Sequence, residues 1–293
     1  AQGDKFILCH SELSEESLYG KDDKSMGISF LKEPVIERPE LIAAWPGIGN
    51  IGLIAVDTLR ALVSAEQFAE VEPWDFFYPH SLTIKNGELA SLDFPASRFY
   101  YKRIGEKDLI LFIGEQQPAP EKKGYQMANY VLEAALRYGC QRVYTCGAAV
   151  SPIHHTMRPR VWAVPNKESL LKEVKSYPNT ILLNELEGRQ GQGSISGLNG
   201  LLLGLAKSRG LDGIGLLGEI PVYISQFPTS YPRASKSVLE VLASHLQITL
   251  DLSNLDSLAG EIDETIEKIY EQIPPEIRRR IDQLKPTEHS REG

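Results

Sequence analysis

The chain has 293 residues, 42% hydrophobic and 24% charged, the balance of a globular protein with a sizeable buried core. Its formal net charge is -8, which excludes a general electrostatic footprint for nucleic acid. No apolar run reaches transmembrane length, and the three scattered cysteines form no disulfide framework, so we expect a cytoplasmic protein with neither membrane nor nucleic-acid partners.

The first elements in chain order are an arm, a strand and a helix. Residues 1–39 are charged and weakly periodic, which indicates an arm with one short strand at 5–8. Residues 41–45 are an apolar run that stops at a Pro–Gly turn, which predicts a buried strand. From Ile51 the apolar residues recur at helical spacing.

The turn between this strand and helix has the G-x-G-x-x-G spacing of dinucleotide-binding turns. That fingerprint also needs a second strand that ends in an acid, and residues 64–73 are too polar and short for a central strand. We therefore favour a tight turn and close helix–sheet packing over an NAD site, with Asn50 capping the helix. An anion can still bind at this helix N-terminus, so Gly47, Gly49 and Asn50 are candidate ligand-binding residues.

The middle of the chain predicts a mixed sheet. Asn86–Gly87 lies between two strand-like runs, which is a strong hairpin signal, and residues 98–103 and 108–114 predict two more strands. Strands and helices then alternate, with strands at 141–147, 160–165, 179–186 and 212–221 and helices at 125–138, 167–174, 198–209 and 233–246. This order predicts a three-layer α/β/α sandwich on a mixed sheet.

Two acids follow buried strands in this pattern. Glu115 and Glu219 come directly after Gly114 and Gly218, and ligands of open α/β sheets gather at the carboxyl ends of strands. If both strands run the same way, these carboxylates are expected to converge with Gln116 and with Asn199 at the start of the next helix. Such a pair can do acid–base work or hold a cation, and the alternative is two solvated loop acids.

Residues 188–200 form a second glycine-rich segment. It has the outer spacing of a phosphate-binding loop but lacks the lysine, so it is not a Walker A motif. Ser194 or Ser196 either caps the following helix or helps to cradle a phosphate or carboxylate. His154 and His155 have no third ligand at a recognisable spacing, so we predict no metal site, and no particular cofactor is indicated.

The C-terminal part has a different character. Two apolar stripes, one at Ile262, Ile266 and Ile269 and one at Ile277 and Ile281, predict two short amphipathic helices separated by a Pro–Pro step. We expect them to pack on the body or on a partner subunit. The predicted organisation is an α/β/α core with its N-terminal arm at 1–250, and a helical extension with a disordered tail at 251–293.

Several segments together resemble the proteasome assembly chaperone type 2 family, whose prokaryotic members are often labelled "ATP-grasp superfamily". The segments are WPGIGNIGLIAVDTL, GEQQP, ISGLNGLLLGLAKSRGLDGIGLLGE and YPRASKSVLEVL, within 41–246. The resemblance implies a phosphorylase/hydrolase-like sandwich and homo-oligomers, and eukaryotic relatives chaperone proteasome α subunits. Proteasome-binding members often end in a hydrophobic–tyrosine–any tripeptide, whereas this sequence ends Arg291–Glu292–Gly293, so we do not expect docking by that route.

Together these observations predict an oligomeric protein-interaction or assembly-chaperone-like protein, with no catalysis demonstrable from the sequence. The alternative is a small-ligand-binding enzyme, resembling either an ATP-dependent carboxylate–amine ligase or a hydrolase or phosphorylase, with its site at the strand ends. In that alternative the catalytic residues are Glu115 and Glu219, and the ligand-binding residues are Gly47, Gly49, Asn50, Gln116, Ser196 and Asn199.

Overall fold

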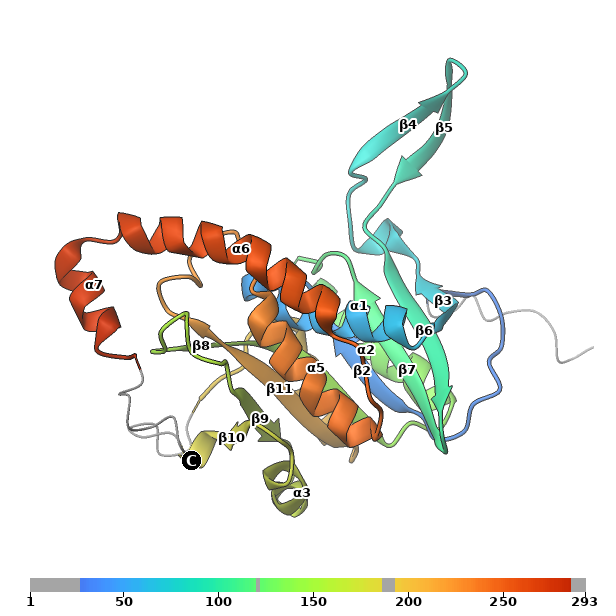
Figure 1. Ribbon diagram of the computed structural model, residues 1–293. Coiled ribbons are helices and arrows are strands. Elements are labelled where there is room, and N and C mark those ends of the chain that lie inside the picture. The colour runs from blue at the N-terminus through green and yellow to red at the C-terminus, as the bar shows by residue number, and fades with distance from the viewer. Residues whose placement is uncertain (1–26, 120–121, 186–192, 286–293) are drawn as a thin grey trace, which may run out of the picture.

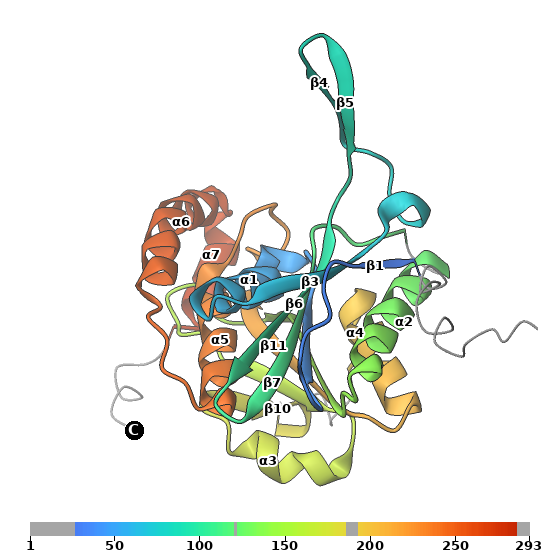
Figure 2. The same cartoon turned by 90° about the vertical axis from the view of Figure 1, so that its right-hand side faces the viewer.

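The computed structural model describes residues 27–119, 122–185 and 193–285, and the predicted strand at 5–8 lies outside them. One nine-stranded sheet lies between two layers of helices (Figures 1 and 2). Its strands, in spatial order, are β1 (Ile28–Phe30), β3 (Glu66–Val71), β6 (Ser97–Ile104), β7 (Lys107–Gly114), β2 (Glu40–Ala44), β8 (Arg142–Ser151), β11 (Asp212–Pro221), β9 (Val161–Pro165) and β10 (Thr180–Leu182). The predicted three-layer sandwich is confirmed.

The centre of the sheet is parallel and its flanks are antiparallel. β7, β2, β8 and β11 are parallel neighbours, so their carboxyl ends share one edge, which we call the strand-end edge. β6 and β9 run antiparallel to this centre, which confirms the predicted mixed sheet. The central strands are apolar along almost their whole length because both of their faces are covered.

Alternate residues of one strand enter two separate cores. Ile42 and Ala44 pack with α1 (Ile51–Leu62), α5 (Pro232–Leu246) and α6 (Ser253–Gln272), whereas Leu41 and Ala43 pack with α2 (Lys122–Arg137) and α4 (Gly197–Ser208). Figure 2 shows the two helical layers on opposite faces of the sheet. The short α3 (Leu171–Lys175) lies beside β10, where the predicted strand 179–186 shortens to Thr180–Leu182.

The C-terminal helices lie on the body. α6 is one helix of 20 residues, and it buries Leu255, Ile266 and Ile269 in the core shared with α1 and α5. After a Pro–Pro step, α7 (Pro275–Asp282) buries Ile281. The expectation that the first apolar stripe packs on the body is confirmed, and the division of the chain at residue 250 stays a prediction. None of the helices in the described ranges is long and apolar enough to span a membrane.

A two-stranded hairpin stands away from the body. β4 (Ser81–Lys85) and β5 (Glu88–Asp93) form a separate sheet that projects beyond both helical layers (Figures 1 and 2). Asn86 and Gly87 have φ values of 53° and 84°, the left-handed pair that a tight hairpin turn requires. The predicted hairpin is confirmed, and it rises from the strand-end edge because β6 begins opposite the end of β7.

Candidate functional site

Two turns meet at the strand-end edge and are joined by one side chain. The 3-10 turn Ile48–Asn50 follows β2, and α4 begins at Gly197. Gln117 Nε2 donates to the carbonyl oxygen of Pro46 at 2.7 Å, and Gln117 Oε1 accepts from the backbone N–H of Leu198 at 3.3 Å. Gln117, which is distant in the sequence, therefore accepts from a backbone N–H of the first turn of α4 that has no partner within the helix. Ser196 occupies the N-cap position of α4, but its side chain makes no capping hydrogen bond. Prediction found the neighbouring Gln116 in the same GEQQP segment and missed Gln117.

A pocket of about 480 Å³ lies between these turns and the end of β8. Three of the predicted residues line it: Gly47, Ser196 and Asn199. The other five, Gly49, Asn50, Glu115, Gln116 and Glu219, are not among its lining residues. The role of all eight in ligand binding or catalysis stays a prediction.

Two buried polar atoms in side chains that line the pocket have no hydrogen-bond partner in the described part of the chain. Trp45 is 1% exposed, and its indole Nε1 is one of them. Asn199 Nδ2 donates to the carbonyl oxygen of Cys146 at 2.8 Å and so links α4 to β8. The second buried atom without a partner is Oδ1 of the same Asn199 side chain. Buried polar atoms nearly always have a hydrogen-bond partner. These two atoms therefore give the wall of the pocket one unpaired donor and one unpaired acceptor.

Two glycines of the first turn are required by its backbone conformation and by close packing on the sheet. Gly49 has a φ of 63°, which side chains rarely adopt, and a Cβ on Gly52 would lie 2.0 Å from the carbonyl oxygen of Cys146. Gly52 thus lets α1 lie directly on β8. Asn50 is the N-cap residue of α1 but its side chain makes no capping hydrogen bond, so the predicted cap by Asn50 is wrong. The reason is its left-handed φ of 48°, because a capping residue normally has an extended backbone.

The turn does not open a dinucleotide-binding unit. β3, the strand that follows α1, is separated from β2 by β6 and β7 and pairs antiparallel with β1 and β6. A dinucleotide-binding unit requires the next strand to pair parallel beside the first. The predicted tight turn with close helix–sheet packing is confirmed, and the strand order differs from that of a dinucleotide-binding unit.

Glu219 is a buried carboxylate that holds β11 to the chain beside it. Its side chain is 1% exposed and accepts hydrogen bonds from the backbone N–H of Arg160 at 3.0 Å, from the Arg160 guanidinium at 3.1 and 3.2 Å, and from Trp162 Nε1 at 3.0 Å. These contacts occupy both carboxylate oxygens. The arrangement is that of a structural carboxylate.

Glu115 and Gln116 are directed toward the hairpin side of the edge. Glu115 accepts from the backbone N–H of Ala96 at 2.9 Å and from Arg98 at 3.3 Å, and Gln116 Oε1 lies 3.0 Å from His80 Nε2. Glu115 directly follows β7, whereas Glu219 lies inside β11, near its carboxyl end. The two strands run the same way, but β2 and β8 lie between them, which separates them by about 14 Å. The expected convergence of the two carboxylates is therefore wrong.

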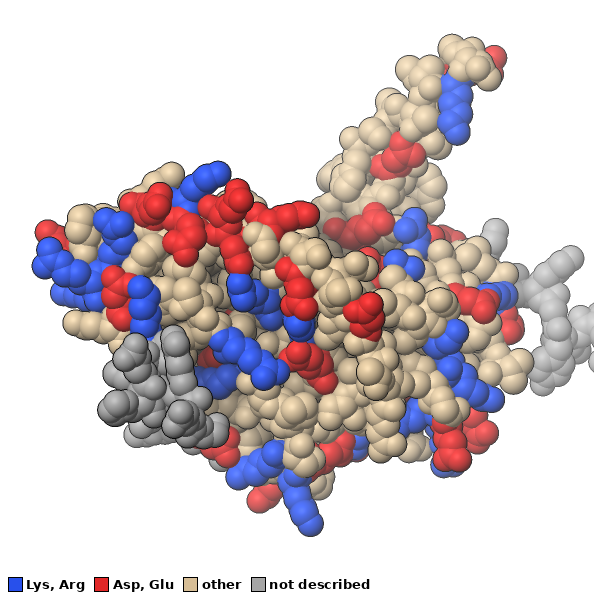
Figure 3. All heavy atoms as spheres, in the orientation of Figure 1, with Lys and Arg blue, Asp and Glu red and all other residues tan. Residues whose placement is uncertain are grey.

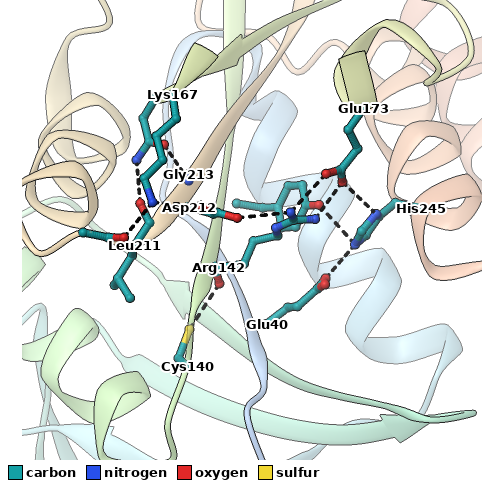
Figure 4. A network of polar contacts seen from close by, with 12 residues as sticks. Glu40, Cys140, Arg142, Lys167, Glu173, Leu211, Asp212, Gly213 and His245 are labelled. Carbon is teal, nitrogen blue, oxygen red and sulfur yellow. Dashed lines mark hydrogen bonds and ion pairs between the residues drawn. The ribbon is translucent and has the colours of Figure 1, made fainter. Parts of the chain in front are cut away.

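A charged network that the sequence analysis missed lies at the opposite, amino-terminal edge (Figure 4). Glu40, Arg142 and Asp212 are the first residues of β2, β8 and β11 and stand in register across three parallel strands. Arg142 donates to Glu173 on α3 at 2.6 and 3.0 Å and to Asp212 at 3.3 Å. The signal that could have found the network is a charge of alternating sign at the start of each buried strand.

His245 of α5 closes this network. Its Nε2 lies 2.6 Å from Glu40 Oε2 and 3.1 Å from the hydroxyl of Tyr144 (Figure 4). Burial opposes ionisation of Glu40, but the hydrogen bond from His245 and the charges of Lys107 and Arg142 hold its pKa below the usual range. The network cross-links strands and helices, as a framework for the sheet.

The histidine pair lies where the C-terminal helices meet the body. His154 and His155 have ring centroids 4.2 Å apart, and His155 lies 2.9 Å from Glu267 of α6 and 2.7 Å from the hydroxyl of Tyr223. Burial, and then the neighbouring His155, lower the pKa of His154 to about 4. The pair therefore docks α6 on the loop after β8.

A family model described as the PAC2 family matches residues 41–270, which is most of the chain. The chain belongs to the PAC2 family. Among the curated relatives of this chain, the uncharacterized protein MJ1210 of Methanocaldococcus jannaschii is 28% identical over 80% of this chain and 84% of its own length.

Solved structures place this PAC2 chain beside two proteins of Pyrococcus furiosus. PbaB, described as an archaeal proteasome activator, is 29% identical with a TM-score of 0.70, over 83% of this chain and 97% of its own. PbaA, described as an archaeal homolog of proteasome-assembly chaperone, is 24% identical with a TM-score of 0.60, over 88% of this chain and 97% of its own. The likeness to PbaA shows the PAC2 fold alone.

Proposed function

We propose that this PAC2 protein acts by protein–protein contact as an assembly-chaperone-like factor, and that its partner is a proteasome. The observation that carries the proposal is the 29% identity to the proteasome activator PbaB across nearly the whole PbaB chain. The site geometry agrees with a scaffold, because the predicted catalytic pair lies apart and Glu219 is held in hydrogen bonds to the chain beside β11.

An assembly reaction tests this proposal. Proteasome α and β subunits from the source organism are mixed with and without the chain, and the yield of complete particles and their peptidase rate are followed. We expect the chain to raise the yield or the rate several-fold over an equal mass of an unrelated acidic protein. An unchanged yield and an unchanged rate would contradict the proposal.

The pocket at the strand-end edge supports a second candidate, the binding of a small anionic or polar ligand. Gly47, Ser196 and Asn199 line it, beside the unpaired atoms of Trp45 and Asn199. Thermal unfolding against phosphate, ATP with magnesium, nucleosides and small carboxylates tests this. A ligand at a hundred times its dissociation constant adds about 2.7 kcal/mol to the free energy of unfolding. We expect a shift that is lost in Asn199→Ala and kept in Glu115→Gln, and no shift with any ligand would contradict this candidate.

A further inference from the structure

The pocket at the strand-end edge lies at the N-termini of two helices that cover opposite faces of the sheet. α1 packs in one core and α4 in the other, as Figure 2 shows, and residues of their first turns line the pocket: Ile51, Gly52, Gly197 and Asn199. Each helix is 12 residues long. Ligands of open α/β sheets bind in such a crevice at the carboxyl ends of the strands. The pocket therefore lies where two helix N-termini can act on one ligand.

Helix ends are the positive features of this pocket. None of the described residues that line it is an acid, a lysine, an arginine or a histidine. A helix N-terminus acts as about half of a positive charge, so the two together match about one negative charge on a ligand. A phosphate ester carries about 1.5 to 2 negative charges at neutral pH, which exceeds what the two helix ends balance. The charge therefore favours a ligand with a single negative charge.

One side chain of the lining has a donor without a partner. Trp45 is 1% exposed, and its indole Nε1 makes no hydrogen bond within the part of the chain that the structure describes. At α4, Ser196 makes no capping bond, and the backbone N–H of Asn199 belongs to the first turn, which has no acceptors within the helix. Buried donors are nearly always paired, so an acceptor on a ligand would complete both groups. A carboxylate offers two acceptor oxygens.

Another part of the lining is apolar. A third hydrophobic cluster, separate from the two large cores, contributes to the pocket the side chains of Trp162, Val164, Leu183, Ile195 and Leu217. The pocket volume of about 480 Å³ is within the range of small-molecule sites. A bare anion such as acetate would leave this apolar surface in contact with water, whereas a ligand with an apolar group covers it. The cluster therefore indicates a ligand with an apolar body.

We propose that this pocket binds a monocarboxylate with an apolar body. Its carboxylate accepts hydrogen bonds from Trp45 Nε1 and from the first turn of α4, and its apolar group packs beside Trp162 and Leu217. The proposal rests on the second candidate function, whose ligand class it names, and it is independent of any proteasome. A free carboxylic acid and the last residue of a peptide share this chemistry, and separate probes distinguish them.

Isothermal titration calorimetry of the full chain tests the ligand class. Phenylacetate is the probe, and each of three matched compounds changes one feature: phenylacetamide lacks the charge, acetate lacks the apolar body and benzyl phosphate replaces the carboxylate by a phosphate. We expect the dissociation constant of phenylacetate to be lower than that of each matched compound by about tenfold or more.

Two results of this titration separate the proposal from the candidate function on which it rests. Equal binding of phenylacetamide, or tighter binding of benzyl phosphate, would overturn the carboxylate assignment and leave the second candidate function intact. Binding of none of these probes, nor of phosphate, nucleosides or ATP with magnesium, would contradict both.

A peptide probe identifies the source of the carboxylate. Acetyl-alanyl-phenylalanine and its C-terminal amide are titrated in the same way, and we expect the acid to bind more tightly than the amide. An acid that binds more tightly than phenylacetate assigns the pocket to a peptide C-terminus, and one that binds more weakly assigns it to a free carboxylic acid. Equal binding of the peptide acid and its amide, with no binding of phenylacetate, would overturn the proposal.

Trp45→Phe isolates the donor, because it keeps an aromatic ring and removes the indole N–H. We expect the dissociation constant of phenylacetate to rise about fivefold or more and the preference for the acid over the amide to fall, which a change in packing alone would not produce. The matched control is Trp74→Phe, at a side chain that is 66% exposed and outside the lining. Thermal unfolding checks that both variants are folded. An unchanged affinity in Trp45→Phe, or equal losses in both variants, would contradict the assigned donor.

The indole signals of isotope-labelled protein locate the ligand by nuclear magnetic resonance. The sequence has three tryptophans, and Trp45 and Trp162 line the pocket whereas Trp74 does not. The two Trp→Phe variants assign the three indole N–H signals. We expect phenylacetate to shift the signals of Trp45 and Trp162 and to leave that of Trp74 in place. A shift of the Trp74 signal alone, or no shift at a saturating concentration, would overturn the proposal.

Discussion

Glu219, inside β11, is more completely hydrogen-bonded than Glu115, which follows β7. Its buried carboxylate accepts from the backbone and guanidinium of Arg160 and from Trp162. Glu115 also binds a backbone N–H, but its side chain is 52% exposed. Water can replace the hydrogen-bond partners of Glu115 and cannot easily replace those of Glu219. We therefore expect Glu219 to contribute more than Glu115 to the stability of the folded protein, and we do not expect the two acids to act as a catalytic pair.

Glu219→Ala should lower the free energy of unfolding by roughly 2–4 kcal/mol, because it leaves a buried backbone donor and a guanidinium without their acceptor. Glu115→Ala, as the matched control, should cost less than about 1 kcal/mol. Equilibrium unfolding in urea, followed by tryptophan fluorescence, measures both. Equal losses in the two variants would show that burial does not separate their roles.

A second residue-scale prediction separates the glycines of the first turn. Gly52→Ala would place a methyl group against the Cys146 carbonyl oxygen and should destabilise the chain by roughly 1–3 kcal/mol. Gly47 has an extended backbone and no atom within 4 Å of an added Cβ, so Gly47→Ala should cost less than about 0.5 kcal/mol. Urea midpoints test the pair, and similar losses at both positions would refute the packing explanation.

At the scale of elements, the docking of α6 and α7 depends on an uncharged histidine. In the unfolded chain His154 takes up a proton as the pH falls below about 6.5, whereas its folded pKa is about 4. The unfolded state therefore binds more protons in this window. The contribution of neutral His154 to the free energy of unfolding is complete above pH 6.5. As the pH falls toward 4, the free energy of unfolding decreases by up to about 3 kcal/mol.

His154→Phe keeps a ring against His155 and removes this titration. The difference in unfolding free energy between the wild type and His154→Phe should move in favour of the variant as the pH falls from 7 to 4.5. Urea unfolding at several pH values measures the difference. Parallel pH profiles of the two proteins would contradict a buried, neutral His154.

Elements with their own local signal were predictable from the sequence. Apolar runs predicted the central strands, and Asn86–Gly87 predicted the hairpin. The first C-terminal stripe predicted an amphipathic helix that packs on the body or on a partner subunit, and the structure shows the body. Features that depend on strand order were not. The order β7-β2-β8-β11 separates Glu115 from Glu219, and the register that joins Glu40, Arg142 and Asp212 links residues distant in the chain. Gln117 was missed because its partners belong to two other segments.

At the scale of the whole molecule, the features that distinguish its surface gather at the strand-end edge and α6. The edge carries the pocket, the joined turns and the base of the hairpin, and α6 presents an acidic surface beside it (Figures 1 and 3). The sheet, with its charged network at the far edge, holds these surfaces in fixed positions.

The central claim is that this PAC2 chain binds proteasome subunits. The measurement that tests it most directly is native mass spectrometry of the chain mixed with proteasome α subunits from the source organism. The account predicts a complex that contains both proteins in a fixed ratio and that disappears on replacement of the α subunits by an unrelated protein. Separate masses for the chain and the α subunits, with no common complex over the tested concentrations, would contradict it.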